Sequence, residues 1–182
     1  MKKLIALILS LLFILSLSAC GQKDADTDMA KNEKTKMGIG IYTVSEGAQD
    51  ATADKNGKFP VSTTVASIVL DADNKIADCR FDALDFDIPL TADGKASAIE
   101  IPETKYNLKD AYAMKEYGGA KYEWYEQADR FAKVVNGKSL EEVKKLLAED
   151  GKGNDDVMKA GCTIEITGFV KALEKAFQNA NN

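Results

Sequence analysis

Two segments of alternating apolar and polar residues flank a short polar turn, and this pattern limits the chain to few folds. Residues 61–70 and 75–82 have the composition of β-strands, with Asp, Ala and Asn between them. Successive side chains of a strand point to opposite faces, so Ala77, Cys79 and Phe81 are expected to share one face. The pattern predicts an antiparallel hairpin.

Further strands are expected on both sides of this hairpin. Residues 37–44 alternate apolar and small side chains, and the polar residues 45–58 after them are expected to form a loop. Residues 86–91 and 95–101 flank Asp93-Gly94, a dipeptide that is typical of tight turns. They predict a second hairpin.

Helical features follow the strands. Asn107 and Asp110 predict the start of a first helix, which Gly118 would end. Ser139 and Glu142 have the spacing of a capping box and predict the start of a third helix.

Two longer helices are expected to carry apolar stripes, at residues 120–135 and at the C-terminus. A sheet of hairpins followed by helices packed on it is the α+β class, and residues 37–182 have the length of one domain. The stripes are Trp124, Ala128, Phe131 and Val135 in the first helix, and Phe169, Val170, Leu173 and Phe177 in the second.

The first 19 residues are predicted to be a signal peptide. Lys2 and Lys3 precede an apolar run, residues 4–17, that is short for a membrane span. The run ends in Leu17-Ser18-Ala19-Cys20-Gly21, which resembles the lipobox of bacterial lipoproteins. That resemblance implies cleavage before Cys20, acylation of this cysteine, and attachment to the cell membrane on the side facing away from the cytoplasm.

The mature chain is expected to be acidic. Residues 20–36 are nearly all small, polar or charged and predict a flexible tether. The whole chain has 24 basic and 29 acidic residues; without Lys2 and Lys3 the counts are 22 and 29, a formal charge of −7. An acidic surface repels nucleic-acid phosphates, so no nucleic-acid partner is expected.

The residue types present restrict the chemistry. The chain has no histidine, which excludes serine–histidine catalysis and histidine-ligated metal sites, and no metal is expected. No nucleophile–base pair is evident, so enzymatic activity stays open, with a redox carrier as the most that the residues support. Cys79 and Cys162 form either a disulfide or two buried thiols, and the sequence leaves both open.

Small and hydroxyl residues precede the last helix, from Ala160 to Gly168. Such residues are typical of a backbone that approaches an anion at a helix N-terminus. The alternative is that they only start a core helix.

Several short motifs occur in an order that resembles the FMN-binding domain of the flavin-carrying C and G subunits of sodium-pumping and related respiratory complexes, and of membrane-anchored lipoproteins. The resemblance covers about residues 37–178. The motifs are Asp73-Asn74-Lys75-Ile76, Glu103-Thr104, Trp124 through Phe131 to Gly137-Lys138-Ser139, and Ala160-Gly161-Cys162-Thr163-Ile164-Glu165.

This resemblance implies a flavin site. FMN would meet Gly161, Cys162 and Thr163 through its phosphate, and Glu103, Thr104 and Trp124 would lie along the pocket.

Two positions depart from the family pattern. In the family a threonine carries the flavin through a phosphoester bond, and Glu165 stands at that position here. A carboxylate cannot accept that bond, so non-covalent binding is expected. Lys105 stands where the family usually has proline.

Two functions therefore remain open at this stage. One is an extracytoplasmic flavoprotein that passes electrons to a redox partner in the membrane, with the protein supplying position and electrostatics. The other is a surface or small-molecule-binding lipoprotein without redox function, which keeps the fold and has lost FMN.

Overall fold

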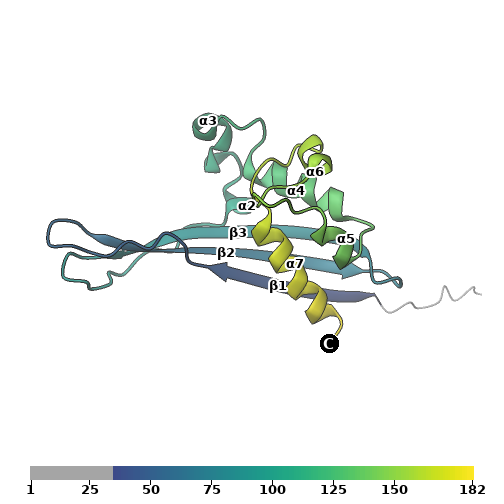
Figure 1. The fold of residues 1–182 in the computed structure, drawn as a ribbon, viewed down its shortest axis with the longest axis horizontal. Helices are drawn as coiled ribbons and strands as arrows, with labels where there is room; N and C mark the ends of the chain where they lie inside the picture. Colours follow the sequence, from purple (N-terminus) through teal and green to yellow (C-terminus); the bar gives the residue numbers. More distant parts are fainter. Residues whose placement is uncertain (1–34) are drawn as a thin grey trace, which may run out of the picture. The chain divides into compact units, whose positions relative to one another are not determined.

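Three strands form an antiparallel sheet in residues 35–182, the part of the chain that the computed structural model describes. They are β1 (Lys36–Val44), β2 (Gly57–Leu70) and β3 (Ile76–Leu90), in the order β1-β2-β3. The two longer strands continue beyond the end of β1 (Figure 1). The sheet precedes all the described helices, which confirms the α+β class.

The hairpin of β2 and β3 is confirmed, with one change in which residues face the core. Cys79 and Phe81 are buried as expected, but Ala77 is exposed and Ile76 is buried in its place. The reason is a shift of register, because Val69 pairs with Asp78 whereas Leu70 pairs with Ile76.

The prediction of a second hairpin is wrong. Residues 86–90 continue β3 and pair with β2, whereas residues 97–101 belong to no strand. The turn around Gly94 does form, because the N–H of Thr91 donates to the carbonyl of Lys95 over 2.9 Å. Beyond it, a single bridge joins Leu90 to Ala96 and pairing stops. The long partner strand β2 takes the hydrogen bonds of residues 86–90 instead.

The first predicted helix is three short helical turns. Thr104 rather than Asn107 caps the first of them. Lys109 and Ala113 have φ of 50° and 58°, in the left-handed region, so an α-helix cannot run through either residue. The helical elements are α2 (Lys105–Leu108), the 3₁₀ helix η1 (Lys109–Tyr112), α3 (Met114–Gly118), α4 (Trp124–Val135), α5 (Leu140–Lys144), α6 (Asp155–Lys159) and α7 (Thr167–Ala180).

The two apolar stripes and the capping box of Ser139 with Glu142 are confirmed. Both stripes are buried against the same face of the sheet. The ring of Phe169 lies 4.5 Å from that of Phe81 on β3, 5.6 Å from that of Phe131 and 5.6 Å from that of Trp124. These four rings connect α7, α4 and the sheet into one core.

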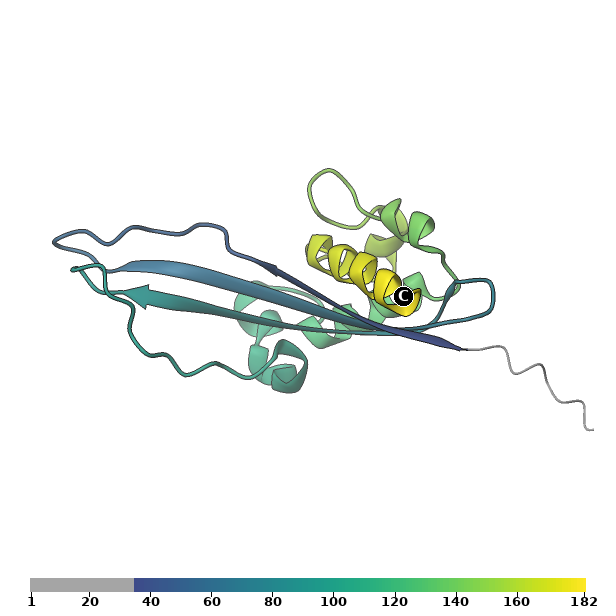
Figure 2. The same cartoon turned by 90° about the horizontal axis from the view of Figure 1, so that it is seen from below.

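Helix α7 packs unusually close to β1, against which it lies in Figure 2. A Cβ atom built on Gly40 would lie 1.9 Å from the carbonyl oxygen of Ala172, and one built on Gly38 would lie 2.0 Å from that of Ala176. Only glycine permits this contact. The two glycines thus fix where α7 sits on the sheet, and so where its N-terminus lies.

The other face of β1 is apolar and exposed. Met37, Ile39 and Ile41 are 74%, 60% and 53% exposed. In the described range, none of the helices is long and apolar enough to cross a membrane.

Candidate functional site

A cleft of about 280 Å³ opens at the N-terminus of α7. The cleft lies on the face of the sheet that carries α7 and α4. At this place the strands extend beyond the N-terminal end of α7. Four groups of residues line it: Tyr42, Val44 and Glu46 at the end of β1; Pro60, Ser62 and Thr64 of β2; Ala83 and Asp85 of β3; and Lys105, Trp124, Glu165, Thr167, Gly168 and Phe169 from the helical half.

Aromatic side chains form part of the cleft wall. Trp124 and Phe169 are only 5% and 4% exposed, and their rings meet edge to face at 70°. Tyr42 is half-buried on the β1 side. The cleft therefore exposes little of either ring, and the phenol of Tyr42 adds a third aromatic group to its wall.

Lys105 carries the positive charge in the cleft. Its ammonium forms an ion pair with Asp85, and its side chain is only 14% exposed. The Nζ atom lies 5.8 Å from the centre of the Trp124 ring. Burial lowers the pKa of Lys105, but the hydrogen bond and the charge of Asp85, together with smaller contributions from Tyr112, outweigh that effect and raise it overall. The lysine is thus charged at neutral pH, and Asp85 already neutralises it.

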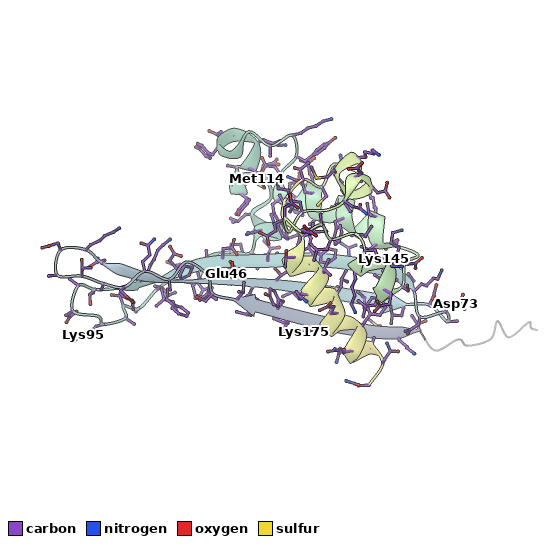
Figure 3. The ribbon with its side chains drawn as sticks, viewed as in Figure 1. Glu46, Asp73, Lys95, Met114, Lys145 and Lys175 are labelled. Atoms are coloured by element: carbon purple, nitrogen blue, oxygen red, sulfur yellow. The ribbon has the colours of Figure 1, made fainter. Side chains whose placement is uncertain are left out.

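Two carboxylates in the cleft have no such partner. Glu46 lies just beyond the end of β1 (Figure 3), and Glu165 lies two residues before α7. Neither takes part in any ion pair between the described residues. Since Lys105 and Asp85 cancel, the uncompensated charge of the lining is −2, from these two glutamates.

The N-terminus of α7 brings hydrogen-bond donors to the cleft. No side chain caps this helix, and its first residues, Thr167, Gly168 and Phe169, all line the cleft. A Cβ atom built on Gly168 would lie 2.6 Å from the Oγ1 atom of Thr64, so glycine leaves room here between helix and strand. The hydroxyl groups of Ser62 and Thr64 face the same space.

The predicted phosphate contacts at the corner before α7 are already occupied. The N–H groups of Gly161 and Cys162 donate to the carbonyls of Met158 and Val157 over 3.0 and 3.2 Å. Both the N–H and the hydroxyl of Thr163 donate to Oε1 of Gln127. Gly161, Cys162 and Thr163 have no free amide N–H for a phosphate and do not line the cleft. These three residues are therefore not candidate ligand contacts of the cleft.

Packing explains the glycine of this corner. Gly161 has φ of 91°, and a Cβ atom on it would lie 2.8 Å from the ring of Tyr122. Arg130 of α4 stacks on that ring at 3.6 Å and donates to the carbonyl of Ala160 over 3.1 Å. The corner is thus fixed to α4 by packing and hydrogen bonds.

Glu103 and Thr104 also have a local role. Thr104 caps α2, and Glu103 accepts hydrogen bonds from Asn107 and from the N–H of Thr104, which lower its pKa. Neither lines the cleft, but the next residue, Lys105, does. Of the six predicted cofactor contacts, only Trp124 lies in the cleft wall.

Sequence reasoning missed several lining residues. Asp85 continues the inward face of Phe81 and Ala83, and a carboxylate on an otherwise apolar face was a signal for a site. Lys105 differs from the family pattern in the sequence, but this difference alone does not predict that it lines the cleft. Glu46, Ser62 and Thr64 gave no signal, because strand pairing alone brings them together.

Both described cysteines are free and buried, so they do not form a disulfide with each other. Cys20 and the predicted signal peptide lie outside the described residues, as does most of the predicted tether.

A flavin fits this cleft in part. The isoalloxazine ring is flat and uncharged and carries carbonyl acceptors, and the cleft offers aromatic side chains, hydroxyl groups and amide donors. The phosphate of FMN carries nearly two negative charges at pH 7. The uncompensated side-chain charges of the cleft are also negative. The residues therefore suit the ring and not the phosphate.

Comparison with family models, with curated proteins and with solved structures gives no significant match to this chain.

Proposed function

We propose that this chain is a lipid-anchored, extracytoplasmic flavin-binding protein whose cleft at the N-terminus of α7 holds the flavin without a covalent bond. One observation carries the proposal. Trp124 and Glu165, which the family resemblance assigns to the flavin pocket and to the flavin attachment point, line one cleft together.

The donors and rings of the cleft would hold the flavin ring. The first N–H groups of α7 and the hydroxyls of Ser62 and Thr64 are suited to its carbonyl oxygens and ring nitrogens. Tyr42 and Trp124 would contact its apolar part. Because Glu165 has no hydroxyl to esterify, binding would rest on these contacts alone.

A bound flavin would supply one- or two-electron transfer. The chain would position the ring on the face of the sheet that carries α4 and α7, where the open side of the cleft stays accessible to a redox partner in the membrane. Acylation of Cys20 and the tether, which ends before β1 because Lys36 already belongs to that strand, would keep the domain close to that membrane.

The flavin proposal is tested on residues 21–182, which contain the whole compact unit of residues 34–182. We expect the purified protein to bind added flavin, seen as visible absorbance that follows the protein through gel filtration. Acid precipitation is expected to leave the flavin in the supernatant, because no ester bond holds it. Flavin that stays with the precipitate would contradict non-covalent binding.

The anchor needs a separate test. The full-length protein is expected to incorporate a labelled fatty acid, and Cys20→Ser is expected to abolish this incorporation. A full-length protein that takes up no label, or equal labelling of the variant, would contradict anchoring through Cys20.

A second function is favoured by the two unpaired carboxylates. Glu46 and Glu165 suit a cationic or strongly hydroxylated small ligand, bound by a lipoprotein that has no redox function. A folded, colourless protein that binds no flavin would support this alternative.

A further inference from the structure

We infer that the cleft selects a flavin without a phosphate, that is, an isoalloxazine ring with an uncharged polyol tail, over its phosphorylated form. This inference rests on the proposed function, since it specifies which member of the flavin class the same cleft takes.

The charge of the cleft disfavours a phosphate. A phosphorylated tail would bring nearly two negative charges to a cleft whose uncompensated charges are Glu46 and Glu165. Lys105 is the one cationic residue of the lining; it is held by Asp85, and its Nζ atom lies 5.8 Å from the centre of the Trp124 ring. Turning it toward a phosphate would leave Asp85 unpaired and would add a third uncompensated carboxylate.

A phosphate would also need amide donors. The corner that precedes α7 has used its own: the N–H groups of Gly161, Cys162 and Thr163 all have partners inside the protein. The remaining donors are the N–H groups of the first residues of α7, which line the cleft together with Glu165; Oε1 of Glu165 and Oγ1 of Thr167 both lie 3.0 Å from a Cβ atom built on Gly151. An anion that approaches them therefore also approaches the Glu165 carboxylate.

The tail of a flavin without a phosphate suits the two carboxylates. A ribityl chain is a series of hydroxyl groups, and each can donate a hydrogen bond. Unpaired carboxylates at the margin of a cleft are good acceptors for such donors. Glu46 and Glu165 are both exposed and lie at the two sides of the cleft, on the β1 side and the α7 side. They would repel a phosphate and accept bonds from a polyol.

The volume of the cleft agrees with a ring inside it and a tail at its margin. The cleft volume of about 280 Å³ is just below the range of about 300–1,000 Å³ that is usual for small-molecule sites. It can enclose one ring system and leaves a tail at the margin, where the two glutamates are.

The test compares riboflavin with FMN on residues 21–182. Trp124 is the single tryptophan of the chain and lines the cleft, so its quenching reports occupancy. At low salt we expect riboflavin to bind about tenfold more tightly than FMN, and we expect the ratio to fall to about twofold in about 0.5 M salt, because salt screens the repulsion.

Two variants separate a local effect from a change in net charge. Glu165→Gln keeps the size of the side chain and removes its charge, and it is expected to reduce the preference for riboflavin at least about threefold. Glu149→Gln makes the same change in net charge at an exposed residue outside the cleft and is expected to leave the preference unchanged.

The outcomes distinguish the two proposals. If FMN binds as tightly as riboflavin, or if Glu165→Gln leaves their ratio unchanged, the inference is overturned while flavin binding stands. If the folded protein binds neither flavin, the proposed function fails and the inference fails with it. Weaker FMN binding that Glu165→Gln restores supports both.

Discussion

The side-chain oxygen of Gln127 accepts two hydrogen bonds from Thr163, one from its N–H at 2.8 Å and one from its hydroxyl at 3.1 Å. Gln127 is 1% exposed, and its amide nitrogen donates to the carbonyl of Tyr122 over 2.9 Å. One buried amide thus joins α4 to the corner before α7. The corner that the sequence predicted as a phosphate site therefore has a structural role, because it connects α4 to the start of α7.

Replacing Gln127 with Leu is therefore expected to destabilise the fold by about 0.5–1.5 kcal/mol, because Thr163 and the carbonyl of Tyr122 lose their hydrogen bonds to this side chain. Thr163→Val removes only the hydroxyl bond and is expected to cost less. Urea unfolding of both variants measures the difference. Equal stability of Gln127→Leu and the unchanged protein would show that the hydrogen bonds of Gln127 contribute nothing to the stability of the fold.

The contact between β1 and α7 gives a second prediction. Gly40→Ala places a methyl group 1.9 Å from the carbonyl of Ala172, so α7 must move or the core must open. We expect a loss of about 3 kcal/mol or more, measured by thermal or urea unfolding. Gly118→Ala is the control: its Cβ would meet nothing within 4 Å, and its stability is expected to change by less than about 0.5 kcal/mol. Similar effects of the two substitutions would contradict the packing.

Local patterns predicted much of this fold. The hairpin, the stripes on α4 and α7, and the capping box at Ser139 each depend on residues close in sequence, and each is confirmed. The register shift that buries Ile76 instead of Ala77, and the extension of β3 through Pro89, depend on pairing with β2 and could not be read locally.

The site was harder to predict for the same reason. The motif at Gly161 marks a backbone that comes close to another group, and that group is the ring of Tyr122 rather than a ligand. The cleft collects residues from three strands and three helices, so only the tertiary structure shows that Glu165 and Asp85 share it.

The ion pair of Lys105 and Asp85 predicts a dependence on pH. Its formation raises the pKa of Lys105 above the ordinary value of 10.5, so its contribution is complete below that pH and is lost as the pH rises through the raised pKa. Asp85→Asn is expected to cost about 1 kcal/mol at neutral pH. The difference in the free energy of unfolding between the unchanged protein and Asp85→Asn is expected to disappear at high pH, as measured by urea unfolding.

The exposed pair of Lys58 and Asp87 is the control for this measurement, with side chains 41% and 47% exposed. Asp87→Asn is expected to change stability by less than about 0.5 kcal/mol. A gap between the unchanged protein and Asp85→Asn that persists at the highest pH would show that the lysine charge is not its cause.

The two buried thiols should be inert in the folded protein. Burial raises the pKa of both, to about 11 for Cys162, so neither forms the reactive thiolate at neutral pH. In residues 21–182, a thiol reagent is expected to label no cysteine until denaturant is added and then to label both. Ser45→Cys, at an exposed residue, is expected to react at once and serves as the control. Rapid labelling of the unchanged folded protein would contradict the burial.

The most direct test of the flavin cleft is a titration of residues 21–182 with riboflavin, followed by the fluorescence of Trp124. Ser62→Phe fills the cleft from β2, whereas Val61→Phe adds the same ring on the opposite face of the strand. We predict saturable quenching at one site in the unchanged protein and in Val61→Phe, and none in Ser62→Phe. No saturable quenching in the folded unchanged protein, or equal binding by Ser62→Phe, would contradict the account.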